Sequence, residues 1–170
     1  GMEYSKERVR EKVQEIKGTV VVDNTHLIKN YFEMANIAFN SEKYFEAENY
    51  CNKIIEIDFK NYKAWILKSK LILIKADAEK NAIFESLKIL KRALEYIPVN
   101  EKKEIINEED VVSIVNTALW DSHSGRDLEF AVDTLSRLID YGIDLDWFEE
   151  MSSLINTIKR VGDASCIVIY

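Results

Sequence analysis

Apolar side chains recur every three or four residues along most of this 170-residue chain. That spacing places them on one face of an α-helix, with charged side chains between them facing solvent. The chain holds one proline and five glycines, so few positions interrupt long helices. The pattern predicts an all-α protein with helices over these stretches: 3–17, 25–40, 44–57, one beginning after Asn61, 82–97, one beginning after Asn107, one ending near Gly142, and 145–161.

Short polar connections predict how these helices pair. The turn over residues 41–43 is so short that its two helices must be antiparallel neighbours. Residues 76–81 are polar and predict a loop, and Pro98 is expected to close the helix after it. Residues 19–22 and 166–170 have β-prone composition. We expect the tail to lie against the last helix or to lack order, while addition to a partner's sheet edge stays open.

A helical-hairpin pattern occurs twice, beginning at Tyr31 and again 34 residues later at Trp65. These two large side chains are expected to fill the interiors of their hairpins. Small residues at the facing positions would let two helices approach closely, and they are Ala35, Ala47, Ser69 and Ser86. The other matching positions are Met34, Ala38, Cys51 and Ile54 in the first copy, and Lys68, Ile72, Leu90, Ala93 and Pro98 in the second.

These positions resemble the motif of the tetratricopeptide repeat (TPR) family. The resemblance implies a right-handed superhelix of antiparallel helical hairpins, because one hairpin cannot bury its apolar face without a stacked neighbour. It also predicts two regions: an N-terminal helix and extended linker over residues 1–23, then a helical-repeat domain over 24–170. Within that domain we expect repeats at 28–61 and 62–100, a degenerate repeat at 107–142 and a capping helix at 145–161. The stretch 17–24 is similar to a linker of some bacterial repeat proteins.

The resemblance further implies a function, protein–protein interaction through a concave groove lined by the first helix of each hairpin. The mixture of lysine, asparagine and apolar groups expected there would suit an extended peptide with acidic and apolar side chains. The alternative for these lysines is simple solvation, with Phe32 and Phe39 packed against neighbouring helices. The expected groove residues are Lys29, Phe32, Asn36, Phe39, Asn40, Lys63, Ile66, Lys70 and Leu73.

Charge and apolar content exclude two classes of partner. The net charge is −7, and residues 101–150 alone sum to −10. A nucleic-acid-binding protein needs a concentrated basic face, so we expect no nucleic-acid partner. No apolar run is long enough to span a bilayer, so we expect no membrane partner. Two cysteines so far apart in sequence do not indicate a disulfide framework, and the expected location is the cytoplasm.

Residues that could carry chemistry are few, and the prediction is a non-catalytic protein without cofactor or metal. Residues 121–123 read Asp-Ser-His, but adjacent residues in one loop cannot converge as a hydrolytic triad. His26 and His123 have no ligand spacing, and His26 is expected to be exposed. Packing is the expected role of four large or sulfur-containing side chains on apolar stripes, namely Cys51, Trp65, Trp120 and Trp147.

Two other classes of function stay open. An enzyme or small-ligand sensor would need a polar pocket between helices, with His123 near Asp121 and Asp127. A structural homo-oligomer would bury the groove against a second copy. The acidic stretch 104–110 could also serve as an anionic docking patch, although a solvated helix start is the simpler interpretation.

Overall fold

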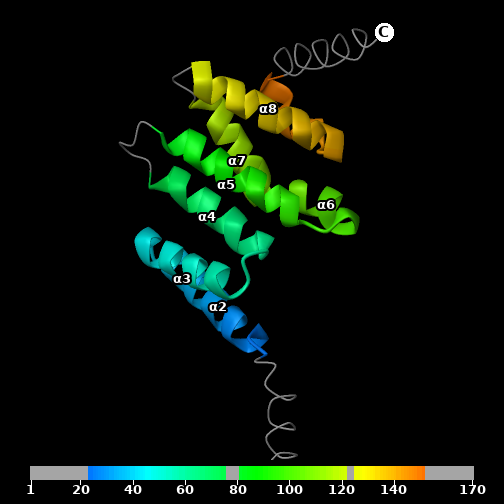
Figure 1. The fold of residues 1–170 in the computed structure, drawn as a ribbon. Helices are drawn as coiled ribbons and strands as arrows, with labels where there is room; N and C mark the ends of the chain where they lie inside the picture. Colours follow the sequence, from blue (N-terminus) through cyan, green and yellow to red (C-terminus); the bar gives the residue numbers. More distant parts are fainter. Residues whose placement is uncertain (1–22, 76–80, 122–124, 152–170) are drawn as a thin grey trace, which may run out of the picture.

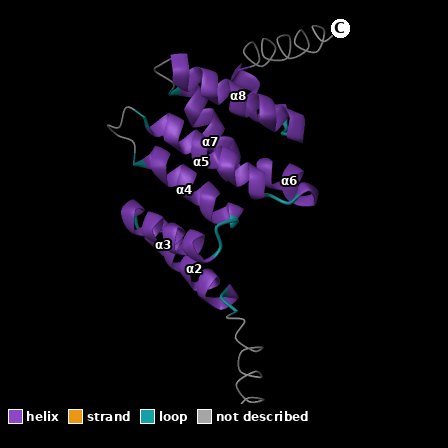
Figure 2. Cartoon of the chain, viewed as in Figure 1, coloured by secondary structure: helices purple, strands orange, loops and turns teal. Residues whose placement is uncertain are grey.

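The computed structural model describes residues 23–75, 81–121 and 125–151, and these ranges are all-helical. Figure 2 shows only helices and their connections in this part of the chain. The described elements are α2 (Thr25–Asn40), α3 (Tyr44–Ile57), α4 (Tyr62–Ile74), α5 (Ala82–Tyr96), α6 (Val99–Ile106), α7 (Glu109–Trp120), α8 (Gly125–Tyr141) and the 3-10 helix η1 (Leu145–Met151).

Three helix pairs follow one another along the stack, α2 with α3, α4 with α5, and α7 with α8 (Figure 1). Neighbouring pairs also touch, because α3 packs on α4, and α5 packs on both α7 and α8. The helices expected at 25–40 and 44–57 are therefore confirmed, and the short turn between them does make them neighbours. No helix in the described ranges is long and apolar enough to cross a membrane.

Local chemistry explains where several helices begin and end. Asn61 caps α4 as expected, since its side-chain oxygen accepts a hydrogen bond of 3.3 Å from the backbone N–H of Ala64. Gly142 follows α8 with φ +89°, a backbone conformation that glycine adopts without steric cost. Asn81 does not cap α5 with its side chain, which instead accepts a hydrogen bond of 2.9 Å from Arg126 of α8.

One helix was not expected from the sequence. Pro98 ends α5, as predicted, but it also begins α6, which occupies Val99–Ile106 between the second and third pairs. Proline is well tolerated at a helix start because its missing N–H would have no intrahelical partner there. The tyrosine hydroxyl of Tyr62 donates a 2.8 Å hydrogen bond to Glu101 and so ties α6 to the start of α4.

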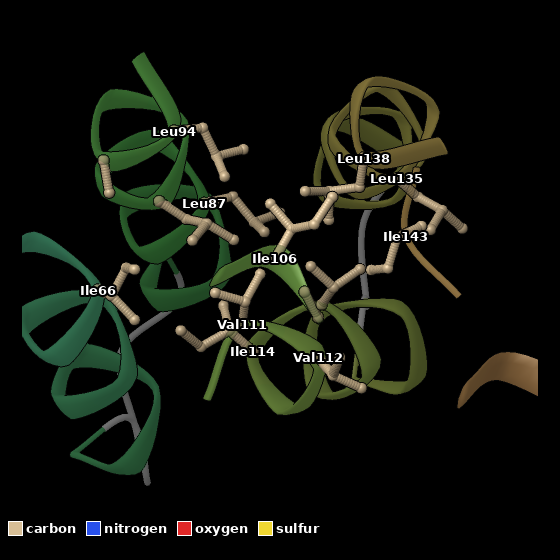
Figure 3. Packing of buried hydrophobic residues seen from close by; sticks show 14 of the residues in the cluster. Ile66, Leu87, Leu94, Ile106, Val111, Val112, Ile114, Leu135, Leu138 and Ile143 are labelled. Atoms are coloured by element: carbon tan, nitrogen blue, oxygen red, sulfur yellow. The ribbon is translucent and has the colours of Figure 1, made fainter. Parts of the chain in front are cut away.

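Buried apolar side chains form two clusters. The larger one joins α4 to α8 and η1, and Figure 3 shows Ile66, Leu87, Val111 and Leu135 converging in it from four different helices. The smaller one joins the first pair to α4 through Ala35, Ala38, Ala47, Cys51 and Leu71. Trp65 and Cys51 are both buried, which confirms their expected packing roles.

The small residues at the hairpin interfaces are buried as the repeat pattern predicts. Ala35, Ala47, Ser69 and Ser86 are all 0% exposed. The two serines face each other between α4 and α5, with their hydroxyl oxygens 2.9 Å apart. Each hydroxyl also lies within hydrogen-bond distance of the other serine's backbone carbonyl, at 2.8 and 2.9 Å.

The end of the described chain differs from the expected α-helix at 145–161. Residues Leu145–Met151 form a 3-10 helix with non-helical backbone angles at Phe148, whose side chain is buried in the larger cluster. Residues 152–161 lie outside the described ranges. The same holds for the expected helix at 3–17, the β-prone stretches at 19–22 and 166–170, and most of the loop at 76–81.

Candidate binding groove

A cleft of about 190 Å³ lies between α4 and α7, the first helices of the second and third pairs. Leu73 and Ile74 form its wall on α4, and Ile114 of α7, which is almost completely buried, forms its floor. Ser113 and Thr117 complete the α7 side with hydroxyl groups. The cleft is therefore mostly apolar, with a few polar groups at its rim.

One residue that lines the cleft, Lys70, belongs to a charged pair. The ammonium of Lys70 lies 2.5 Å from Asp110 of α7, and both side chains are partly exposed. The same ammonium lies 5.0 Å from the centre of the Phe39 ring on α2, within the range of a cation–π contact. Three consecutive first helices are thus linked side by side through Phe39, Lys70 and Asp110.

An exposed tryptophan is the last residue of α7, the helix that forms one wall of the cleft. Trp120 lies three residues after Thr117 and seven after Ser113, so it shares their helix face. It is 61% exposed, and Trp147 of η1 is 50% exposed. The expectation that both tryptophans pack in the core is wrong, because Val115, Ala118 and Leu119 already fill the buried face of the last two turns of α7.

The structure separates the nine expected groove residues into three groups. Lys70 and Leu73 line the cleft, and Phe39 contacts Lys70. Ile66 is 6% exposed and points into the larger cluster (Figure 3), so it contributes to packing and offers no groove surface. The remaining five are exposed or half-buried on α2 and at the start of α4, and they are Lys29, Phe32, Asn36, Asn40 and Lys63.

A second hollow, of about 420 Å³, lies where α6, α8 and η1 meet. Asn107 lines it, and its amide group donates to the carbonyls of Lys103, at 2.7 Å, and Gly142, at 3.3 Å. Its side-chain oxygen accepts a 2.7 Å hydrogen bond from the backbone N–H of Asp144. These bonds hold two chain connections together, so we assign Asn107 a structural role.

The clearly shifted pKa values among the described residues belong to groups outside the cleft. Burial raises the pKa of Cys51 to about 12, and the nearby Glu48 adds to the effect. Burial and the hydrogen bond to Glu101 raise the pKa of Tyr62 to about 12. The hydrogen bond from Lys91 lowers the pKa of Asp133. These shifts follow from packing and pairing and do not mark an acid–base pair.

The residues of the alternative polar pocket are not brought together in the described part of the chain. Asp121 is exposed at the end of α7, Asp127 is buried in α8, and His123 lies outside the described residues. His26 is exposed, as expected. Within the described ranges, no group of three or more His, Cys, Asp or Glu side chains is close enough to hold a metal ion.

Comparison of the chain with protein-family models, with curated proteins and with solved structures found no match. The geometry of the described residues is therefore the basis for a functional assignment.

Proposed function

We propose that this protein is a non-catalytic interaction module that binds an extended segment of another protein across the inner face of α2, α4 and α7. In this proposal the three helix pairs form a TPR-like array, with α6 inserted before the third pair. The order of pairing and the close serine contact in the second pair support that interpretation.

The cleft between α4 and α7, with exposed Trp120 beyond it, is the observation on which the proposal rests. A mostly apolar cleft of about 190 Å³ can receive one aliphatic or aromatic side chain of a ligand. An exposed tryptophan next to such a cleft is typical of the residues that contribute most to protein–protein binding. The cleft is therefore proposed to anchor an apolar side chain of the bound segment.

The charged residues on this face limit which side chains the bound segment is expected to carry. Because Lys70 is already paired with Asp110, it has little capacity to neutralise an acidic ligand group at the cleft. Lys29 of α2 and Lys63 of α4 are exposed on the first helices of the first and second pairs, and they can bind acidic groups farther along the ligand. The proposed segment therefore carries an apolar anchor, with acidic side chains to one side of it.

Selection of binding peptides from a displayed random library would test this proposal. Selected peptides are expected to share an aliphatic or aromatic anchor. Thr117 is exposed, so replacing it with arginine should place a long charged side chain in the cleft without removing core packing. The affinity of the protein for the selected peptides should then fall at least about tenfold. Glu129→Arg, an exposed substitution on α8, provides the matched control and should leave their affinity unchanged.

Two results would contradict the proposal. Peptides that bind Thr117→Arg as tightly as the wild type would place the site on another face. Failure to select any peptide, together with a concentration-dependent size in ultracentrifugation that Thr117→Arg abolishes, would favour a homo-oligomer that buries this groove.

A further inference from the structure

The hollow where α6, α8 and η1 meet has the size of a small-molecule site. Its volume of about 420 Å³ falls within the range of about 300–1,000 Å³ that is usual for such sites. The hydrogen bonds of Asn107 to the backbone of Lys103, Gly142 and Asp144 hold its walls together. Gly142 also leaves room for the stem of Lys103, whose carbons lie 3.7–3.8 Å from the position that a Cβ would take. The hollow is therefore formed by the fold before any ligand binds.

Two side chains of opposite charge line this hollow. Lys103 of α6 supplies an ammonium, and Asp144, in the connection after α8, supplies a carboxylate. Among the residues that the structure describes, neither forms an ion pair with the other or with a third residue. One oxygen of Asp144 accepts a hydrogen bond of 3.1 Å from the backbone N–H of Asp146, which orients the carboxylate and leaves its other oxygen for a ligand.

An indole ring adds an apolar surface beside these charges. Trp147 of η1 is 50% exposed, and its backbone carbonyl accepts a hydrogen bond of 3.4 Å from Asn116 of α7. A ligand with only a positive charge would be repelled by Lys103, and one with only a negative charge by Asp144. A ligand that carries both charges and an apolar group matches all three side chains.

We propose that this hollow binds the zwitterion of a free α-amino acid with an apolar or aromatic side chain. The ammonium of Lys103 pairs with the ligand's carboxylate, the carboxylate of Asp144 pairs with its ammonium, and Trp147 packs against its side chain. The flexible stem of Lys103 lets its ammonium follow the ligand. The hollow shares no described lining residue with the cleft between α4 and α7, so this site is independent of the proposed function.

Titration of the ¹⁵N-labelled full-length chain with phenylalanine, at about pH 6 where α-amino groups are protonated, tests the proposal. The chain has three tryptophans, and a Trp147→Phe variant identifies the indole N–H signal of η1. That signal should shift and saturate with a Kd on the order of 1 mM, as expected for about a dozen non-hydrogen atoms in an open site. The signal of Trp120, which is 61% exposed, should stay in place and so controls for nonspecific stacking.

Two blocked probes separate the contributions of the two charges. Phenylalanine amide lacks the carboxylate and N-acetylphenylalanine lacks the ammonium, so each should bind the wild type about fivefold more weakly than phenylalanine. Lys103→Gln should abolish the preference for phenylalanine over the amide. Asp144→Asn keeps an oxygen that can accept the Asp146 N–H, and it should abolish the preference over N-acetylphenylalanine. Partial unfolding of a variant would not produce these matched losses of preference.

Three results would overturn the proposal. In the first, the Trp147 signal shows no saturable shift at about 20 mM phenylalanine, well above the expected Kd. In the second, either blocked probe binds the wild type as tightly as phenylalanine, which would assign the hollow to a ligand with a single charge. In the third, the Trp120 signal shifts as much as that of Trp147, which would mean stacking on any exposed indole.

Discussion

The close contact of Ser69 and Ser86 between α4 and α5 predicts how much larger or smaller side chains at this position should change the free energy of unfolding. Ser69 and Ser86 are both 0% exposed, and their hydroxyl oxygens are 2.9 Å apart. Each hydroxyl carries one proton, so two of the three short contacts can be hydrogen bonds at any time. Replacing Ser69 with alanine removes one such bond, while Ser86 can still donate to the carbonyl of Ser69 at 2.9 Å.

The expected cost of Ser69→Ala is therefore about 1 kcal/mol in the free energy of unfolding, the usual net value of one hydrogen bond. Ser69→Val should cost more. It loses the same hydrogen bond and also adds two methyl groups where the helices touch, which typically costs a further 1–3 kcal/mol or so. We expect a total of about 2–4 kcal/mol for valine, since the two contributions act together.

Urea denaturation followed by far-UV circular dichroism measures both values, provided that the slope with denaturant is unchanged. Glu95 lies on the exposed face of α5 and provides the control. Comparing Glu95→Ala with Glu95→Val gives the difference in helix propensity alone, about 0.5 kcal/mol. If valine at position 69 costs no more than alanine after that correction, the helices are not closely spaced there and the packing argument fails.

Three further predictions concern single residues. Replacing Cys166, the second cysteine of the chain, with serine leaves Cys51 as the one thiol. In this variant, Cys51 should react with a thiol reagent on the order of a thousandfold more slowly in the native than in the unfolded protein. Folding raises the pKa of Cys51 from 9.0 to about 12, so the native state holds the thiol proton that the unfolded state loses above pH 9. The contribution of the buried thiol to the free energy of unfolding should therefore be complete below pH 9 and disappear toward pH 12. Tyr62→Phe should lower the free energy of unfolding by about 0.5–1 kcal/mol, a difference that should shrink as pH rises from 10 toward 12 in urea titrations. Gly142→Ala should cost about 1 kcal/mol in thermal melts because φ is +89°, whereas Gly125→Ala, with no atom within 4 Å of the added carbon, should cost nothing.

Helical periodicity was sufficient to predict most of the fold. The expected helices at 25–40 and 44–57 agree with α2 and α3 to the residue, because polar turn residues bound clear apolar stripes. The helix α6 was missed because Pro98 was interpreted only as a stop, although proline also suits the start of a helix. The 3-10 geometry of η1 depends on how Phe148 enters the core, which no local pattern encodes.

The candidate site was predicted less completely, and the reason is tertiary. The family resemblance predicted Lys70 and Leu73 for the groove face, and both line the cleft, but it could not indicate that Asp110, 40 residues later, would pair with Lys70. Nor could it indicate that Ile66 would be buried by the third pair. Trp120 continues an apolar stripe in sequence, and only the arrangement of α7 against its neighbours leaves it exposed.

The pairing of Lys70 with Asp110 has a consequence for the kinetics of binding at the cleft. The two charges cancel where the ligand anchor would enter, so the local field does little to guide an approaching partner. Any electrostatic guidance of an acidic segment, and its dependence on ionic strength, should then come from the exposed Lys29 and Lys63 and not from the cleft. Among ligands that differ only in the apolar anchor, differences in affinity would appear almost entirely in how long each one stays bound.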